Sequence, residues 1–147
     1  MKIRELVESD RQVWQELFAG YLVFYKTELT NSQIDLTWER ILDSTYNLYG
    51  KVAEINGALK GITHYSYQPS TWAPIDYCYL EDLYVDPENR GAGIGRALIE
   101  SVKDEAVAHG SSRLYWNTDV TNTTARKLYD SFTLESGKIQ YRVSLSD

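Results

Sequence analysis

The chain has a single cysteine, Cys78, so no disulfide bond can form within it. No apolar run is long enough to cross a membrane, and the first residues lack the apolar core of a secretory signal. Lysine and arginine number 15 against 21 aspartates and glutamates, which leaves a net charge of −6. Nucleic-acid-binding proteins usually carry a basic patch, so that class is disfavoured. We expect a cytoplasmic protein with no nucleic-acid or membrane partner, and Cys78 as a small core residue.

Histidine is also scarce. The two copies, His64 and His109, share no metal-ligand spacing with cysteine, aspartate or glutamate. We therefore expect no metal site and interpret both histidines as strand or surface residues. The acidic balance suits a cationic substrate, although ordinary acidic solubility explains it equally well.

The length of 147 residues suits one domain over residues 1–147. Ser9 to Gln12 resembles a capping box at the start of a helix, Asn56-Gly57 predicts a hairpin turn, and Gly110 suits a helix end. Hydrophobic periodicity predicts strands near residues 2–7, 51–55, 58–67, 77–85, 113–118 and 139–145, and helices near 10–25, from 35, 94–109 and 122–132. This order predicts an α/β fold, a mixed sheet with helices on both faces.

One glycine-rich stretch lies between a predicted strand and a predicted helix. It reads Arg90, Gly91, Ala92, Gly93, Ile94, Gly95 and Arg96. Alternate glycines let the backbone turn and approach a ligand, and the first N–H groups of the next helix point to the same place. The stretch predicts a site for a phosphate-sized anion, with a simple tight turn as the alternative. It is neither a nucleotide P-loop, which continues with Gly-Lys-Ser/Thr, nor the dinucleotide fingerprint, which has glycine at the position of Arg96.

In this region the chain resembles the GNAT superfamily of acyl-CoA N-acyltransferases. The family's acyl-CoA loop, Arg/Gln-x-x-Gly-x-Gly/Ala, is matched by Arg90–Gly95, the strand before it by Tyr79–Val85, and the next helix by Asn122 and Ala125–Tyr129. The likeness covers roughly residues 50–145 and is greatest to the histone/polyamine and diamine N-acetyltransferase branches. It implies the GNAT fold, acetyl-CoA as the acetyl donor, a small-molecule amine as acceptor, and a homodimer.

The resemblance also assigns contacts to the acetyl donor. Arg90 and the backbone of residues 91–96 would hold the CoA pyrophosphate. Leu83, Tyr84 and Val85 would offer backbone groups to the pantetheine arm and the thioester carbonyl, helped by a bulge in their strand. Asn122 would touch the CoA arm.

The chemistry asks for a base and an acid. An alkyl ammonium has a pKa of about 10.4 and cannot attack a thioester until it loses a proton. The resemblance makes Glu81 the expected base and Tyr129, near the sulfur, the expected acid for the leaving thiolate. Glu81 and Asp82 are strand neighbours and should point to opposite faces, one toward the site and one free for a structural ion pair; Asp82 would otherwise help hold a cationic acceptor. A core tyrosine with a hydrogen-bonded hydroxyl is the alternative for Tyr129.

Three aromatic residues, Tyr25, Trp38 and Trp72, are candidates to line an amine pocket through cation–π contacts, although aromatic residues of this kind more often belong to the core and sheet. One position departs from the family pattern. Thr133 stands where the family has glycine after the tyrosine helix, and a β-branched residue suits a left-handed helix stop poorly. We therefore expect a different helix end and a shifted pocket beside Tyr129.

These observations predict an N-acetyltransferase that passes an acetyl group directly from acetyl-CoA to the primary amine of a polyamine, diamine or lysine-like molecule. Two alternatives remain open: acetylation of a protein amine, at a lysine or an N-terminus, and a non-catalytic acetyl-CoA sensor. A small acidic pocket would indicate a polyamine acceptor, whereas an open groove would indicate a protein.

Overall fold

The computed structural model describes residues 1–146, in two compact units. The first unit, Met1–Trp116, contains the sheet and the helices α1 (Arg11–Phe24), α2 (Asn31–Leu42) and α3 (Ile94–His109). The second unit begins at Asn117 and contains α4 (Thr123–Asp130). No helix in residues 1–146 combines the length and apolar character needed to cross a membrane.

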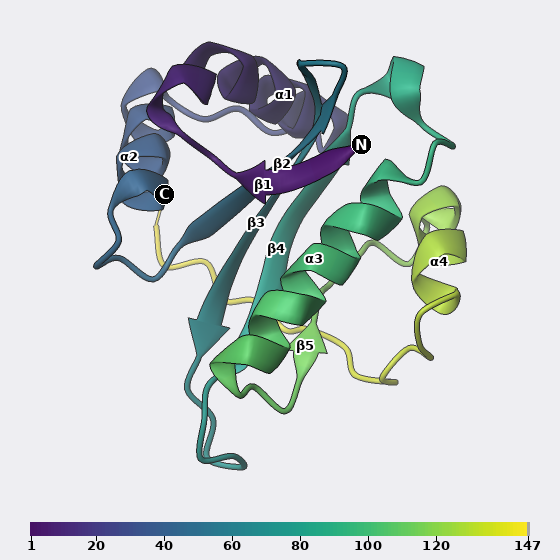
Figure 1. The fold of residues 1–147 in the computed structure, drawn as a ribbon. Helices are drawn as coiled ribbons and strands as arrows, with labels where there is room; N and C mark the ends of the chain where they lie inside the picture. The colour runs from purple at the N-terminus through teal and green to yellow at the C-terminus, as the bar shows by residue number, and fades with distance from the viewer. Residues whose placement is uncertain (147) are drawn as a thin grey trace. The chain divides into compact units, whose positions relative to one another are not determined.

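The sheet of the first unit has five strands in the order β1-β2-β3-β4-β5. Their bounds are β1 Lys2–Glu5, β2 Tyr49–Ile55, β3 Ala58–Gln68, β4 Tyr77–Val85 and β5 Leu114–Tyr115. The first three pairings are antiparallel, and only β4 with β5 is parallel, over Cys78–Leu114 and Tyr79–Tyr115. Two of the helices cover one face and α3 covers the other (Figure 1). The expected mixed α/β sheet is confirmed.

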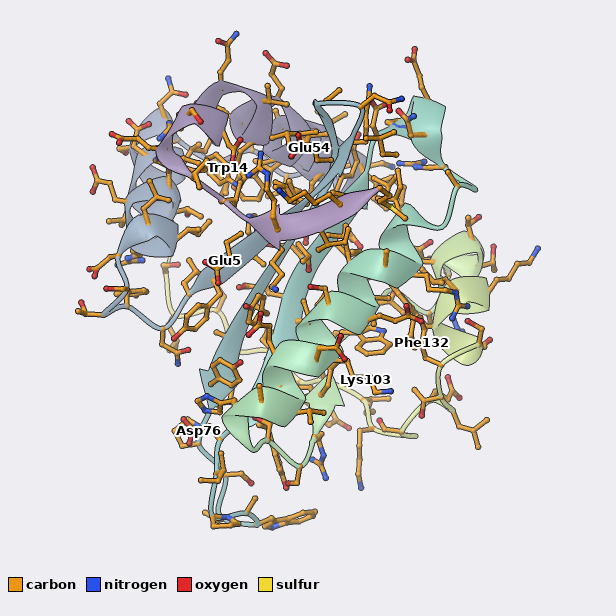
Figure 2. All side chains as sticks on the ribbon, viewed as in Figure 1. Glu5, Trp14, Glu54, Asp76, Lys103 and Phe132 are labelled. Carbon is orange, nitrogen blue, oxygen red and sulfur yellow. The ribbon has the colours of Figure 1, made fainter. Side chains whose placement is uncertain are left out.

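The two faces of the sheet carry different cores. Val52 of β2 packs with Trp14 of α1 and Trp38 of α2, whereas the next residue, Ala53, packs with Ile94 and with another α3 residue, Leu98. Neighbours on a strand point to opposite faces, so the face of each side chain follows from its partner. Trp14, labelled in Figure 2, is fully buried. Cys78 is buried as expected.

The hairpin and the end of α3 are as predicted. Asn56 (φ 50°) and Gly57 (φ 80°) form the turn between β2 and β3, and Gly110 (φ 92°) ends α3 in the left-handed region. The second predicted helix starts earlier than residue 35, at Asn31, because the Thr30 hydroxyl accepts from the Gln33 N–H.

The predicted capping box at Ser9 is wrong. A short 3₁₀ turn, η1 (Glu8–Asp10), precedes α1. Asp10, and not Ser9, stabilises the start of this helical segment. Its carboxylate accepts from the Val7 N–H at 2.9 Å and pairs with Arg4 at 2.7 Å. A carboxylate with a cationic partner outcompetes a hydroxyl for this position.

The predicted strand over residues 139–145 is absent. Residues 134–146 carry no regular secondary structure, and the alternating apolar side chains are exposed: Ile139 77%, Tyr141 87%, Val143 83% and Leu145 94%. A strand forms only where a partner edge supplies hydrogen bonds, and alternation alone does not supply one.

Candidate active site

A bulge in β4 brings two carboxylates to one place. Asp82 pairs with His64 of β3, but the next pair is Leu80 with Tyr65, so Glu81 is an extra residue between them. The Thr63 hydroxyl donates to the Asp82 carbonyl at 2.8 Å and helps hold this irregularity. Glu81 and Asp82 therefore line the same cavity, and the expectation that they face opposite ways is wrong.

This acceptor cavity, as we call it, has a volume of about 420 Å³ and lies on the α1 and α2 side of the sheet. Phe18 and Leu22 of α1 give it an apolar wall. One face of α2 provides a polar wall of Gln33, Thr37 and Arg40, residues at helical spacing. Carboxylates, apolar surface and a guanidinium thus line one small space.

A hydrogen-bonded chain fixes Asp82. The Trp14 indole N–H donates to His64 Nε2 at 2.9 Å, and His64 Nδ1 lies 2.8 Å from Asp82 Oδ2. Since Nε2 accepts from Trp14, the proton belongs on Nδ1, which donates to Asp82. The Tyr21 hydroxyl also bonds to Asp82, and burial together with this carboxylate raises the pKa of Tyr21. Asp82 therefore has a fixed position in the cavity wall.

Glu81 differs from Asp82 in its surroundings. No described residue forms a hydrogen bond or ion pair with its carboxylate. Loss of water to the cavity walls raises its pKa above the ordinary 4.5, the charge of Asp82 raises it further, and His64 opposes this in part. A carboxylate with a raised pKa and no fixed partner is suited to accept and release a proton.

The glycine-rich loop has the backbone that its sequence predicts. Gly91 (φ 85°) and Gly93 (φ 79°) are left-handed, and α3 begins directly at Ile94. A Cβ at either glycine would meet nothing within 4 Å, so both positions face open space. The Arg90 side chain reaches back to the Val85 carbonyl at 3.4 Å, which ties the loop to β4. The first backbone N–H groups of α3 therefore open onto free space beside two left-handed glycines. Such N–H groups can bind an anionic group.

The strand before this loop offers backbone atoms along its outer edge. β5 pairs with β4 only as far as Tyr79, so β4 continues beyond that pairing from Leu80 to Val85. Leu83 and Val85 pack their side chains toward α3, whereas Tyr84 packs toward Gly20 of α1. These side chains are used in packing, which leaves the strand edge for main-chain contacts.

Asn122 and Tyr129 belong to the second unit. Asn122 caps α4 by accepting from the Ala125 N–H at 3.3 Å, at the start of the helix that the sequence predicts near residues 122–132. Tyr129 lies in the last turn of α4 and is partly buried. After the helix, the N–H groups of Phe132 and Thr133 both donate to the Tyr129 carbonyl, and Ser131 is right-handed, so Thr133 does not have to form a left-handed stop.

None of the three aromatic candidates lines the acceptor cavity. Trp38 belongs to the buried core, 4.9 Å from Trp14 between ring centroids, and Trp72 is 80% exposed on the β3–β4 loop. The Tyr25 ring lies tilted against the Tyr21 ring, with 4.8 Å between their centroids, and it is Tyr21 that lines the cavity. The helical spacing of the aromatic residues predicts α1 correctly but does not identify which of them faces the cavity.

A second cavity, about 580 Å³, lies near the β2–β3 hairpin. Its charged groups include Arg4, paired with Asp10 at 2.7 Å, and Lys60, paired with Asp86 at 3.3 Å. Because these charges neutralise one another, the smaller cavity with the two carboxylates is the better candidate for chemistry. Among residues 1–146, no group of three His, Cys, Asp or Glu residues gathers as a metal site requires.

Of the residues that line the acceptor cavity, sequence reasoning identified Glu81 and Asp82 and missed the others, among them His64, Tyr21 and Arg40. The signal for Arg40 was present, because Gln33, Thr37 and Arg40 recur at helical spacing as a polar stripe. His64 carried no such signal, since its role comes from the register of β3 against β4.

A family model and several known sequences match most of the chain. The model of the acetyltransferase (GNAT) family matches residues 11–133. The D-amino-acid N-acetyltransferase HPA3 of Saccharomyces cerevisiae is 32% identical over 143 residues, covering 95% of this chain and 88% of that protein. The thialysine N-epsilon-acetyltransferase of Caenorhabditis elegans is 31% identical over 133 residues, covering 89% and 82%.

Solved structures show the same fold. A probable acetyltransferase superposes with a TM-score of 0.88 at 22% identity, covering 100% of this chain and 99% of the other. AAC(6′)-Iy, in complex with the bisubstrate analogue CoA-S-monomethyl-acetylneamine, superposes with a TM-score of 0.85 at 18% identity, covering 99% of this chain and 98% of the other.

Proposed function

Because the chain belongs to the GNAT acetyltransferase family and is an acetyl-CoA-dependent N-acetyltransferase, we propose that it acetylates the primary amine of a small polyamine, diamine or lysine-like molecule in the acceptor cavity. The observation that carries this proposal is the pair of carboxylates, Glu81 and Asp82, in the wall of one small cavity. Two negative charges favour a protonated amine. Two relatives lend support, since D-amino acids and thialysine are the small amines in their names.

The two carboxylates have different roles in this proposal. Asp82, held by His64 and Tyr21, binds the ammonium and keeps it in place. Glu81 has no such anchor, and its raised pKa lies closer to the pKa of the ammonium whose proton it must accept. Glu81 therefore takes the proton from the ammonium and leaves an amine with a free electron pair.

The donor side of the site fits acetyl-CoA. Left-handed Gly91 and Gly93 and the start of α3 supply N–H groups for a pyrophosphate, and the outer edge of β4 from Leu83 to Val85 supplies main-chain groups for an extended arm. The bound donor supplies an acetyl group activated as a thioester, with a thiolate as leaving group. Gly91, Ala92, Ile94, Gly95 and Arg96 would hold the CoA phosphates with Arg90 and Gly93.

The second unit completes the proposal. On the family resemblance, Tyr129 gives its phenolic proton to the departing thiolate, and Asn122 contacts the CoA arm. The new C–N bond forms as the C–S bond breaks, so no side chain of the enzyme becomes acetylated. On the same resemblance we propose that the protein is cytoplasmic and forms a homodimer. Sedimentation velocity on the purified chain tests the oligomeric state directly.

The experiment for the acceptor measures thiol release from acetyl-CoA with a panel of amines. The panel holds spermine, spermidine, putrescine, lysine, thialysine, an amino sugar and a histone-tail peptide. We expect saturable thiol release with one class of small amine and a much weaker signal with the peptide. Mass spectrometry must show one acetyl group added to the acceptor for each thiol released.

The opposite results have distinct meanings. Turnover with the peptide alone would overturn the small-molecule acceptor in favour of a protein amine. Silence across the panel, while acetyl-CoA still raises the melting temperature, would overturn the proposed acceptor class and favour a protein acceptor or a non-catalytic sensor.

A further inference from the structure

One cationic side chain stands in the otherwise acidic acceptor cavity. Arg40, in the last turn of α2, lines the same space as Glu81 and Asp82. Both ring nitrogens of His64 are already engaged, one with Trp14 and the other with Asp82. The cavity thus holds a guanidinium and a pair of carboxylates.

Arg40 forms no ion pair within the described residues. Within residues 1–146, no carboxylate oxygen lies within 4.0 Å of its side-chain nitrogens, whereas Arg4 and Arg11 pair with Asp10 and Asp35. The guanidinium lies over the Tyr46 ring, 4.7 Å from its centroid. Such stacking orients the guanidinium plane but leaves its N–H groups for hydrogen bonds in that plane.

Other polar residues of the cavity wall are already engaged. Asn47 donates to the Tyr67 carbonyl at 2.6 Å and accepts from the Tyr67 N–H at 2.8 Å. The amide of Gln33 lies 3.4 Å from the Thr37 hydroxyl. Arg40 is therefore the wall residue best able to bind an anionic group of a ligand.

We infer that the acceptor is a zwitterionic amino acid, with its carboxylate on Arg40, its reacting amine on Glu81 and Asp82, and its side chain against Phe18 and Leu22. This inference rests on the proposed function and narrows it to one substrate class. A guanidinium binds a carboxylate through two parallel hydrogen bonds. The same guanidinium repels the distal ammonium of a diamine or polyamine, so the cavity selects against acceptors with positive charges only.

Matched acceptors test this inference on the unaltered enzyme. Lysine and cadaverine differ only in the carboxylate, as do alanine and ethylamine. We expect kcat/KM for each amino acid to exceed that of its decarboxylated partner by about ten- to a hundredfold, the range for hydrogen bonds to charged groups. Equal or better turnover of cadaverine and ethylamine would overturn the inference and leave the proposed function intact. Silence with all four, at saturating acetyl-CoA, would overturn the inference, and silence with spermidine as well would overturn the proposed function.

Variants then assign the effect to Arg40. Arg40→Gln should raise KM for lysine about tenfold or more while leaving KM for cadaverine unchanged or lower, and Arg40→Lys should recover part of the loss. Arg11→Gln is the matched control, because Arg11 is an arginine of the neighbouring helix outside the acceptor cavity. An equal rise of KM for lysine and cadaverine in Arg40→Gln would contradict a carboxylate contact. Unchanged circular dichroism shows that each variant is folded.

Discussion

His64 Nδ1 lies 2.8 Å from Asp82 Oδ2, and the other ring nitrogen accepts from an indole at the centre of the core. The imidazole is 1% exposed, so its orientation is set before any ligand binds. His64 thereby holds the Asp82 carboxylate in one orientation before an ammonium binds, so little conformational entropy of Asp82 is lost on binding.

The His64–Asp82 contact gives a first prediction. His64→Leu removes the hydrogen bonds of this side chain to Trp14 and Asp82. It should lower the free energy of unfolding by about 1–3 kcal/mol, since the buried Trp14 N–H loses its acceptor. It should also raise KM for the amine. In His64→Asn the side-chain amide can replace Nδ1 as donor, so KM should partly recover although stability does not. Urea unfolding and steady-state kinetics measure the two effects, and an unaltered KM in His64→Leu would contradict the positioning role of His64.

Glu81→Gln tests the base. We expect kcat/KM of the wild type to fall on the acid side with a midpoint above 4.5, because burial and Asp82 raise the pKa of Glu81. The variant should be about 10²- to 10⁴-fold slower near neutral pH and should lack this limb. Above that midpoint the deficit of the variant should grow as pH falls, because more of the amine is protonated; below it the wild type loses its base as well, and the deficit should stop growing. Glu39→Gln, beside Arg40 on α2 but outside the acceptor cavity, is the control. A pH profile identical to that of the wild type would exclude Glu81 as base.

The same raised pKa predicts an effect on stability. The folded state binds a proton at Glu81 more readily than the unfolded chain does, so ionisation of Glu81 costs stability as pH rises through and beyond 4.5. Glu81→Gln should therefore be as stable as the wild type near pH 4 and more stable at pH 7. Thermal unfolding at the two pH values checks this, and a variant less stable than the wild type at pH 7 would contradict it.

Gly93→Ala and Gly57→Ala form a matched pair. Both glycines have φ close to 80° and open space where a Cβ would stand, so each substitution should cost about 1 kcal/mol of stability. Only Gly93 lies at the start of α3. We expect Gly93→Ala alone to weaken acetyl-CoA binding in calorimetry, and equal weakening in Gly57→Ala would show that the loss comes from stability.

Tyr129→Phe tests the acid. The variant should bind CoA as the wild type does and lose most of its turnover, because a phenyl ring cannot protonate a thiolate. Tyr141→Phe, at a side chain 87% exposed, should change neither quantity. A kcat for Tyr129→Phe equal to that of the wild type would remove Tyr129 from the mechanism.

Most of the fold could be predicted because its signals are local. β4 occupies residues 77–85 as predicted, and Asn56-Gly57 and Gly110 mark their turns through backbone preferences that depend on the residues alone. The strand over residues 139–145 could not be judged this way. Whether an alternating segment becomes a strand depends on an edge elsewhere in the chain, which periodicity does not reveal.

The candidate site was predicted only in part, because some of its residues carry local sequence signals and others depend on long-range pairing. Glu81, Asp82 and the glycine-rich loop carry recognisable motifs in the sequence. The expected opposition of the two carboxylates failed because strict alternation assumes a regular strand, and the bulge arises from pairing with β3. Tyr21, His64 and Arg40 become neighbours of these carboxylates only when α1, α2 and β3 come together.

The extra residue at Glu81 also reverses the phase of β4. Before it, Leu80 lies opposite Tyr65 and thus on the α3 side; after it, Asp82 lies opposite His64 on the α1 side, although the two are only two positions apart. Deletion of position 81 would make Leu80 and Asp82 direct neighbours on opposite faces, so regular alternation would return and the other side chains would keep their present faces, but the cavity would lose one of its two carboxylates. The extra residue is therefore not required by the packing of the strand on either side of it, and the length of β4 is as much a part of the site as its carboxylates.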